Sequence, residues 1–109
     1  MKMITAMIRP EQAQGVKKAL EEKGFLGLTL TEAMGRGSQK GIALKSGNGT
    51  TRIDLLPKAE LMLVVDDKRE KLALETIISS ARTGKIGDGR IFVCDVNKSI
   101  RIRTGEVEG

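Results

Sequence analysis

The sequence predicts an α+β fold in which two helices pack on one face of a four-stranded antiparallel sheet. Two observations support this prediction. Along the 109 residues the patterns read strand, helix, strand, long loop, strand, helix, strand. Apolar residues alternate with period two in the strands and recur at helical spacing between them. Right-handed crossovers place two such halves in one sheet with both helices on the same side.

The first half of the chain begins with a strand over residues 2–9 that is expected to be largely buried on both faces. Its alternation puts on one face Ile4, Ala6 and Ile8, and on the other Met3, Thr5 and Met7. Pro10 suits the first turn of a helix. The apolar stripe of that helix is Ala13, Val16, Ala19 and Leu20. Gly24 ends the helix as a C-cap, and a second strand is expected over residues 28–34.

Residues 35–58 interrupt the pattern with glycines and with polar or basic residues, and Pro57 closes this stretch. A loop of this length inside a compact domain is normally functional. Ile42, Leu44 and Ile53 alternate within it, so part of the loop is expected to become a strand on binding. The loop is therefore predicted to be an adaptable recognition segment.

The second half of the chain repeats the order of the first. A strand over residues 60–65 precedes a helix whose start has capping-box spacing between Asp67 and Glu70. The stripe that this helix is expected to bury is Leu74, Ile77, Ile78 and Ala81. A glycine-rich turn then leads to a fourth strand over residues 90–96, in which Cys94 is expected to be a small core residue.

These elements form a single domain over residues 1–109 with the ferredoxin-like βαββαβ arrangement. One face of its sheet carries apolar residues but no helix to cover them: Met3, Thr5, Met7, Met62 and Val64. A second subunit is the simplest cover for such a face, so the chain is expected to form a homo-oligomer.

The composition narrows the class of function. A net charge of +5 favours an anionic partner, but two phenylalanines without any tryptophan or tyrosine cannot build a base-stacking platform, so no nucleic acid is expected. The chain has no histidine, and its one cysteine lacks an activating neighbour, so it is expected not to be an enzyme. The single cysteine and the lack of a signal peptide or a transmembrane-length apolar run predict a cytoplasmic protein.

The strongest local motif lies in residues 82–90 and reads Thr83-Gly84-Lys85-Ile86-Gly87-Asp88-Gly89-Arg90. Its glycines allow backbone amides to converge on a phosphate group. Lys85 and Arg90 add cationic donors, and Asp88 is interpreted as a residue that fixes the loop. The alternative is a plain helix-to-strand turn with solvated charges, and the spacing alone favours neither.

A second motif lies in the tail over residues 97–109. Its alternation predicts a short strand with Arg101 and Arg103 on the same face, about 7 Å apart, which suits a polyphosphate. The alternative is a solvated basic tail. Two weaker motifs precede these: Gly35-x-Gly37 after the second strand, and Pro57-Lys58, where an ammonium group could meet a carboxylate.

Together these segments resemble the PII family of nitrogen-regulatory signal proteins, over about residues 1–106. The matching segments are Thr29-x-Thr31-Glu32, Gly35-x-Gly37-x-Gln39-Lys40-Gly41, Asp54-x-Leu56-Pro57-Lys58, residues 83–93 and residues 101–106. The resemblance implies a homotrimer with nucleotide sites between its subunits. It also implies that residues 36–55 are the recognition loop of the family (the T-loop) and that residues 82–90 are its phosphate-binding loop (the B-loop).

The resemblance implies the ligands and their residues. ATP or ADP would be held by Thr29, Gly35, Gly37, Gln39, Lys40, Val64, Gly87, Asp88, Gly89, Arg90, Arg101 and Arg103. Among these, Thr29 and Val64 would contact the adenine. The effector 2-oxoglutarate would be held by Gly37, Gln39, Gly41, Lys58 and Gly87, with Lys58 on its distal carboxylate. Gln39 would also bind Mg²⁺, which prefers oxygen ligands and commonly shares them with phosphates.

The function implied is a sensor of ATP, ADP and 2-oxoglutarate whose T-loop shifts between conformers and regulates a nitrogen-metabolism partner. Candidate partners are an ammonium transporter, glutamine synthetase and nitrogenase, and a transporter would bring the protein to the membrane. The alternative function is a ferredoxin-like regulatory module that binds another small ligand, an adenylate or an amino acid, with an output outside nitrogen metabolism.

The chain departs from the family mainly in the T-loop. Thr51 stands where many relatives carry a modifiable tyrosine, and no covalent modification is expected. Gly49 leaves no serine for phosphorylation, and Gly47 replaces an arginine of the channel-blocking relatives. Outside the loop tip, Ser38 replaces a usual arginine and Met62 a usual glutamate. These changes predict ordinary ligand sensing with a different output.

Overall fold

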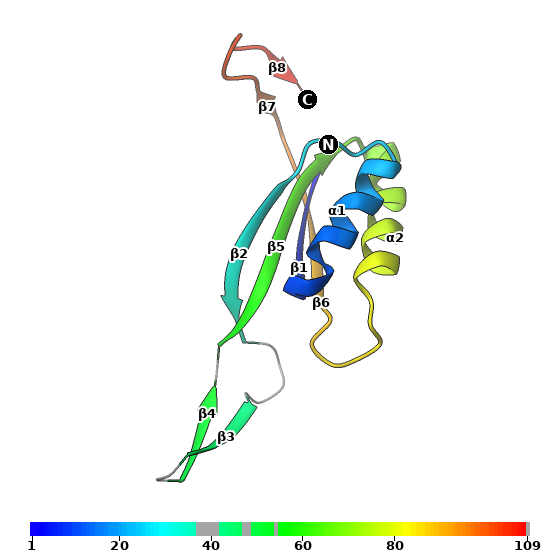
Figure 1. Cartoon of the computed structure of the whole chain (residues 1–109). Coiled ribbons are helices and arrows are strands. Elements are labelled where there is room, and N and C mark those ends of the chain that lie inside the picture. The colour runs from blue at the N-terminus through cyan, green and yellow to red at the C-terminus, as the bar shows by residue number, and fades with distance from the viewer. Residues whose placement is uncertain (37–41, 47–48, 54, 109) are drawn as a thin grey trace.

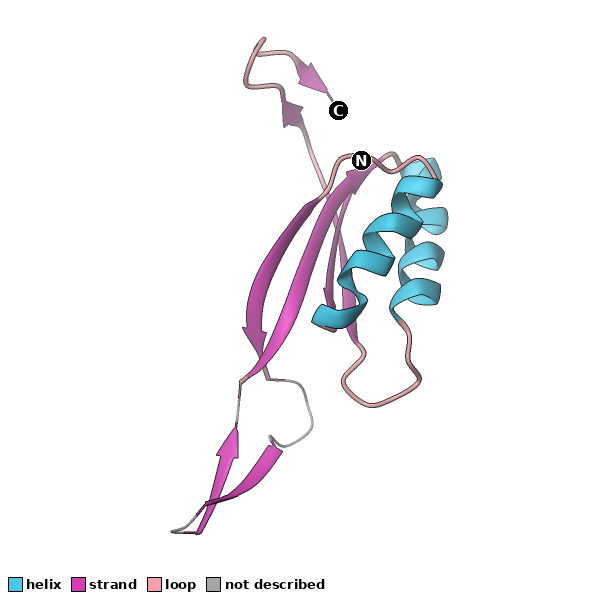
Figure 2. Cartoon of the chain, in the orientation of Figure 1, coloured by secondary structure: helices cyan, strands magenta, loops and turns pink. Residues whose placement is uncertain are grey.

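The computed structural model of the chain describes residues 1–36, 42–46, 49–53 and 55–108. Its main sheet has four antiparallel strands in the order β2-β5-β1-β6. The strands are β1 (Lys2–Ile8), β2 (Thr29–Gly35), β5 (Leu56–Val65) and β6 (Gly89–Asp95). The helices α1 (Ala13–Glu22) and α2 (Glu70–Ala81) lie side by side on one face of this sheet, as Figure 2 shows. The predicted ferredoxin-like α+β sandwich is therefore confirmed.

Two small hairpins project from opposite ends of this body (Figure 1). One lies in the predicted recognition loop and pairs β3 (Ile42–Ser46) with β4 (Gly49–Ile53). The other lies in the tail and pairs β7 (Ser99–Ile100) with β8 (Val107–Glu108). The radius of gyration is 17.0 Å, whereas a compact domain of this length has about 13 Å. Both hairpins thus extend away from the core.

The core lies between the sheet and the two helices. Alternate residues of β1 point into it, and Ile4, Ala6 and Ile8 are at most 2% exposed. Burying each large aliphatic side chain of this kind contributes about 1.5–3 kcal/mol to stability. The buried side chains that meet them are Val16 and Leu20 from α1, Ala73 and Ile77 from α2, and Leu61 and Leu63 from β5.

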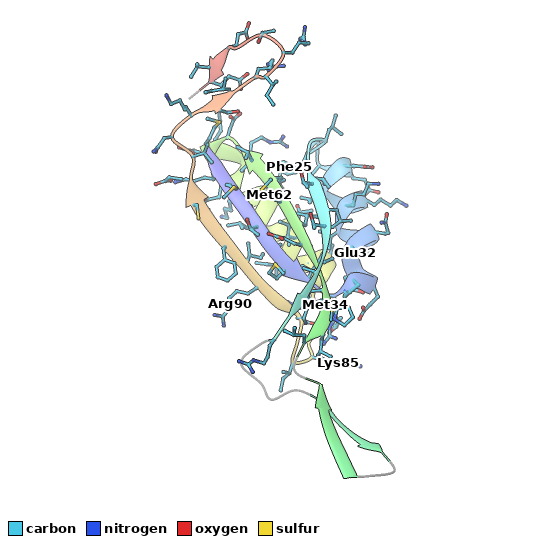
Figure 3. The ribbon with its side chains drawn as sticks, turned by 90° about the vertical axis from the view of Figure 1, so that its left-hand side faces the viewer. Phe25, Glu32, Met34, Met62, Lys85 and Arg90 are labelled. Atoms are coloured by element: carbon cyan, nitrogen blue, oxygen red, sulfur yellow. The ribbon has the colours of Figure 1, made fainter. Side chains whose placement is uncertain are left out.

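The other face of the sheet has no helix over it, as the sequence predicted (Figure 3). Met3, Thr5 and Met7 of β1 are partly exposed there. Val64 is 46% exposed and Phe92 is 53% exposed on the flanking strands. The alternation in β1 predicts burial of both faces, but within one chain only the side that faces the helices is fully buried.

The ends of α1 agree with the sequence. Pro10 opens a single 3-10 turn that leads into the helix, where a missing N–H costs nothing. Gly24 has a φ of +89° just past the helix end, and its N–H donates to the carbonyl of Glu21 at 3.0 Å. The guanidinium of Arg69 then closes this turn by stacking 4.1 Å from the centre of the Phe25 ring and donating to the carbonyl of Lys23 at 2.6 Å.

The predicted capping box of the second helix is wrong. No side chain caps the 3-10 turn Asp67–Arg69 or the start of α2. The carboxylate of Asp67 instead accepts a hydrogen bond from the N-terminal ammonium group at 2.9 Å. This contact lowers the pKa of Asp67, and it forms because β1 runs beside β5 and starts where β5 ends.

Two predictions about burial are also wrong, each because of the face on which the residue lies. Ile78 is 41% exposed, whereas Thr76 is buried and donates its hydroxyl to the carbonyl of Leu72 at 2.7 Å. Helix α2 is therefore rotated relative to the predicted stripe. Cys94 is exposed because it lies opposite Met3, on the face of the sheet that the helices do not cover.

The strand boundaries differ by one residue except at β5, which begins at Leu56 and was expected only from Glu60. Pro57 was interpreted as the end of the loop, but it lies inside this strand. The strand tolerates it because β1 pairs with β5 only from Ala59 onward, so one edge of Pro57 has no strand beside it.

The tail also differs from its predicted strand. Residues 102–104 form a turn, and the amides of Arg101 and Gly105 donate to the carbonyls of Glu106 at 2.8 Å and Arg101 at 2.7 Å. Gly105 has a φ of +74°, which lets the chain reverse. Arg101 and Arg103 are therefore not side by side on one face of a strand.

Gly89 is the glycine that the fold most requires. Its φ is +108°, and a Cβ atom there would lie 1.7 Å from the carbonyl oxygen of Met7. We expect Gly89→Ala to lower the free energy of unfolding by at least about 3 kcal/mol, because β6 would have to move off β1. Gly84→Ala is the matched control, since Gly84 also has a positive φ but open space around it, and should cost about 1 kcal/mol. Equal losses in urea denaturation would contradict this explanation.

Candidate functional site

A cavity of about 620 Å³ lies at the end of the sheet where the turn between α2 and β6 approaches β2 and β5. Its volume is in the range of small-molecule sites. Among the described residues its lining includes four cationic side chains: Arg36, Lys58, Lys85 and Arg90. Asp88 is the one acidic residue in the part of the lining that the structure describes. The electrostatics of this cavity therefore favour an anion.

Asp88 organises the turn from inside. Its carboxylate accepts hydrogen bonds from the amides of Thr83 at 2.9 Å and Gly84 at 2.8 Å, and also from the Thr83 hydroxyl. These bonds, the hydroxyl first among them, hold the pKa of Asp88 well below its usual range. The carboxylate therefore stays ionised and is used within the turn, which confirms that Asp88 fixes the loop.

The same turn leaves amides available on the cavity wall. In the described part of the chain, the amides of Ile86 and Gly87 donate to no other residue. Both residues line the cavity, and Gly87 has a φ of +99° that only glycine adopts easily. Adjacent free amides beside cationic side chains suit the oxygens of a phosphate or carboxylate.

Three of the predicted site residues meet at this point. The ammonium group of Lys58 donates to the carbonyl of Gly87 at 3.1 Å and comes from β5. Gly35 of β2 lies beside it, and a Cβ atom at Gly35 would be 3.3 Å from Cγ of Lys58. The absent side chain at Gly35 therefore leaves Lys58 room to reach the turn.

Arg9 is a residue that the sequence analysis missed. It follows β1, and its Nε donates to the carboxylate of Asp88 at 3.0 Å. One of its terminal nitrogens donates to the carbonyl of Ile86 at 2.8 Å. In the sequence it is a single basic residue before Pro10, which carries no sign of a partner 79 residues away.

A second group of predicted site residues lies toward the other end of the sheet. Thr29 pairs with Met62, six residues from Gly35, which is about 20 Å along a strand. Val64 lines a separate cavity of about 360 Å³ near Phe25 and the tail. Arg101 and Arg103 belong to the tail hairpin, where Arg101 donates to Glu108 at 2.9 Å. Figure 3 shows the separation, with Met62 toward Phe25 and Arg90 toward Lys85.

The remaining predicted site residues are outside the described residues. They are Gly37, Gln39, Lys40 and Gly41, together with the substituted positions Ser38 and Gly47. Gly49 and Thr51 lie in β4.

The chain is an α+β domain with a cationic cavity beside a glycine-rich turn, and comparison with known proteins gives its family. Residues 1–106 match the family model described as nitrogen regulatory protein P-II. Nitrogen regulatory protein P-II 2 of Methanothermobacter thermautotrophicus is 51% identical over 97% of this chain and 92% of its own length. P-II 1 of Escherichia coli K12 is 47% identical over 97% of this chain and 95% of its own length. The chain belongs to the P-II family.

Membership in this family defines the protein as a PII-type signal transducer, a class of regulators rather than enzymes. The resemblance found in the sequence motifs is thus confirmed over nearly the whole chain. Within the residues that the structure describes, no helix is both long enough and apolar enough to span a membrane.

The carboxylate of Asp88 makes stability depend on pH in a defined direction. An unfolded aspartate has a pKa of about 3.9, and the folded value is lower, so this group stabilises the fold above about pH 4 and loses that contribution as the pH falls. We therefore expect Asp88→Asn to lower the melting temperature at pH 7 and the gap to wild type to shrink below pH 4. Glu32→Gln controls for the loss of one exposed negative charge. A gap that widened in acid would contradict the assignment.

Proposed function

We propose that this protein is a homotrimeric PII signal transducer that senses ATP or ADP together with 2-oxoglutarate and regulates a nitrogen-metabolism partner through residues 36–55. One observation supports it above the others: four cationic side chains and the free amides of Ile86 and Gly87 gather around one cavity beside the turn held by Asp88. Family membership supports the same class of function.

The phosphates of the nucleotide occupy this cavity. The amide of Gly87 and the side chain of Arg90 face them, while Gly89 gives the close approach to β1 that places the turn. Asp88 contributes by holding the loop, because its carboxylate is already used within the turn. Lys40, which lies outside the described residues, adds a further cation from the T-loop.

The adenine half of the site comes from a neighbouring subunit. Thr29, Val64, Arg101 and Arg103 lie toward the opposite end of the sheet from the cavity, so one chain cannot bring both halves to one nucleotide. A cyclic trimer solves this by placing the tail end of one subunit against the cavity of the next. The uncovered face of the sheet is then buried between subunits, which supports the same arrangement.

The keto acid 2-oxoglutarate occupies the part of the cavity next to Lys58. The ammonium group of Lys58 receives its distal carboxylate, with Gly37, Gln39, Gly41 and Gly87 around the rest of the molecule. Mg²⁺ fits only together with the phosphates, because the described lining offers one carboxylate and Asp88 uses it within the turn. Gln39 supplies the neutral oxygen ligand that such an ion accepts.

The signal is a shift in the population of T-loop conformers. Ligands move such an equilibrium only through different affinities for its states. Gly35 and Lys58 lie where β2 and β5 enter the T-loop, so a ligand held at Lys58 acts on both of its ends. The loop then docks on a target such as an ammonium transporter, glutamine synthetase or nitrogenase. The protein acts in the cytoplasm, and a transporter partner brings it to the membrane.

Calorimetry with ATP, ADP and 2-oxoglutarate tests the site directly. We expect 2-oxoglutarate to bind only with Mg²⁺ and ATP present, because its site includes the shared metal ligand. Gln39→Ala should abolish binding of 2-oxoglutarate and leave ADP affinity within about threefold. Binding of 2-oxoglutarate without nucleotide would exclude the coupled site. Failure of ATP and ADP to bind would favour a ferredoxin-like module for another ligand.

Mixed trimers test whether the site lies between subunits. One variant carries Lys85→Ala and Arg90→Ala, and the other carries Arg101→Ala and Arg103→Ala. Each alone should lose nucleotide binding, whereas random trimers formed by refolding a 1:1 mixture should regain about a quarter of the sites. Light scattering of each sample checks that the variants and the mixture have the mass expected for a trimer. Zero recovered capacity in mixed trimers would show that both groups act within one chain.

A further inference from the structure

The side chain of Arg9 connects the end of β1 to the turn at residues 83–89. It is 24% exposed and donates to two acceptors of that turn, the carboxylate of Asp88 and the carbonyl of Ile86. Within the described residues, every other hydrogen bond to the Asp88 carboxylate comes from the turn itself, from Thr83 and Gly84. Arg9 is therefore the link between this carboxylate and the sheet.

The contact with Ile86 fixes the direction of one peptide group. In a trans peptide the carbonyl of Ile86 and the N–H of Gly87 lie in one plane and point in opposite directions within it. Arg9 holds that carbonyl and is not part of the cavity lining, whereas Gly87 is. The amide of Gly87 is thereby turned away from Arg9 and toward the cavity.

Lys58 fixes the next peptide group from the other side. It lines the cavity and holds the carbonyl of Gly87 at 3.1 Å. The two cations thus bind consecutive carbonyls, those of Ile86 and Gly87, from opposite sides of the turn. The positive φ of Gly87 allows the chain to reverse direction between them.

We propose that Arg9 is a positioning residue for the anion site: it sets the shape of the turn and aims the Gly87 amide at the bound phosphate without touching the ligand. This inference rests on the proposed nucleotide site. A cation at this position is required because its partner is an ionised carboxylate. A lysine would keep the contact with Asp88 but could not hold both acceptors in the planar geometry of a guanidinium.

The test compares Arg9→Met, which removes the charge, with Arg9→Lys, which keeps it. We expect Arg9→Met to weaken ADP binding about tenfold, as for the loss of one hydrogen bond to a charged group. Arg9→Lys should fall between wild type and Arg9→Met, because a lysine keeps the contact with Asp88 but cannot hold the carbonyl of Ile86 at the same time. Gln12→Ala is the matched control, since Gln12 donates to the carbonyl of Ser80 at 3.3 Å in the same region but does not touch the turn. Lys17→Met controls for one lost positive charge on α1.

Hydrogen exchange of the ligand-free protein supplies a readout that a simple charge effect would not change. The amides of Thr83 and Gly84 are bonded to Asp88, so loosening that carboxylate should raise their exchange in Arg9→Met and leave it unchanged in Lys17→Met. Wild-type ADP affinity in Arg9→Met, or unaltered exchange in the turn, would overturn the proposal. If wild type itself bound no ADP, the proposed function would fail, whereas altered exchange would still show that Arg9 shapes the turn.

Discussion

The close contact between the turn at residues 83–89 and the end of β1 is the constraint on which the rest of the structure depends. Gly89 lets two backbones approach where any Cβ atom would collide with the carbonyl of Met7. The carboxylate of Asp88, one residue earlier, accepts hydrogen bonds from amides of the turn and from the guanidinium of Arg9. Together these contacts fix the wall of the cavity relative to the sheet, so the backbone amides of the turn are held in place beside the cationic side chains of the lining.

The distribution of the site along the sheet connects binding to assembly. The cavity with Lys58 and Arg90 lies at one end, and Val64 with the tail hairpin lies at the other. A ligand that needs both ends needs two chains. The uncovered face also carries the partly exposed methionines of β1 and the exposed Phe92. Burying these apolar side chains between subunits favours association of the same chains. The proposed ligand site and the proposed subunit contacts therefore share one surface of the fold, since Met7 and Phe92 of the uncovered face also line the cavity.

The segments in which this chain keeps the P-II family motif and the positions at which it departs from the motif lie mostly in different parts of the molecule. The turn with Gly87 and Gly89 and the strand that carries Lys58 keep the family motif and lie in the main body of the fold. Two of the substituted positions, Gly49 and Thr51, lie in β4 of the hairpin that extends away from that body (Figure 1), whereas Met62 lies in β5 of the main sheet. The hairpin of the loop can therefore change in sequence while the motif beside the cavity is kept.

The sequence alone determined the elements, their order, the buried face of β1 and the glycine motif, because local periodicity and backbone requirements fix these features. Tertiary structure decided what depends on neighbours far along the chain. Pro57 lies within β5 because β1 stops short of it, Cys94 is exposed because its face lacks a helix, and Asp67 binds the N-terminus because β1 starts beside it. Arg9 is the clearest example of a contact that the sequence does not predict, because only folding brings it to Asp88. Spacing in the sequence predicts which residues share one face of a strand or helix. The distances between segments that are remote in the sequence depend on which strands pair and in which register.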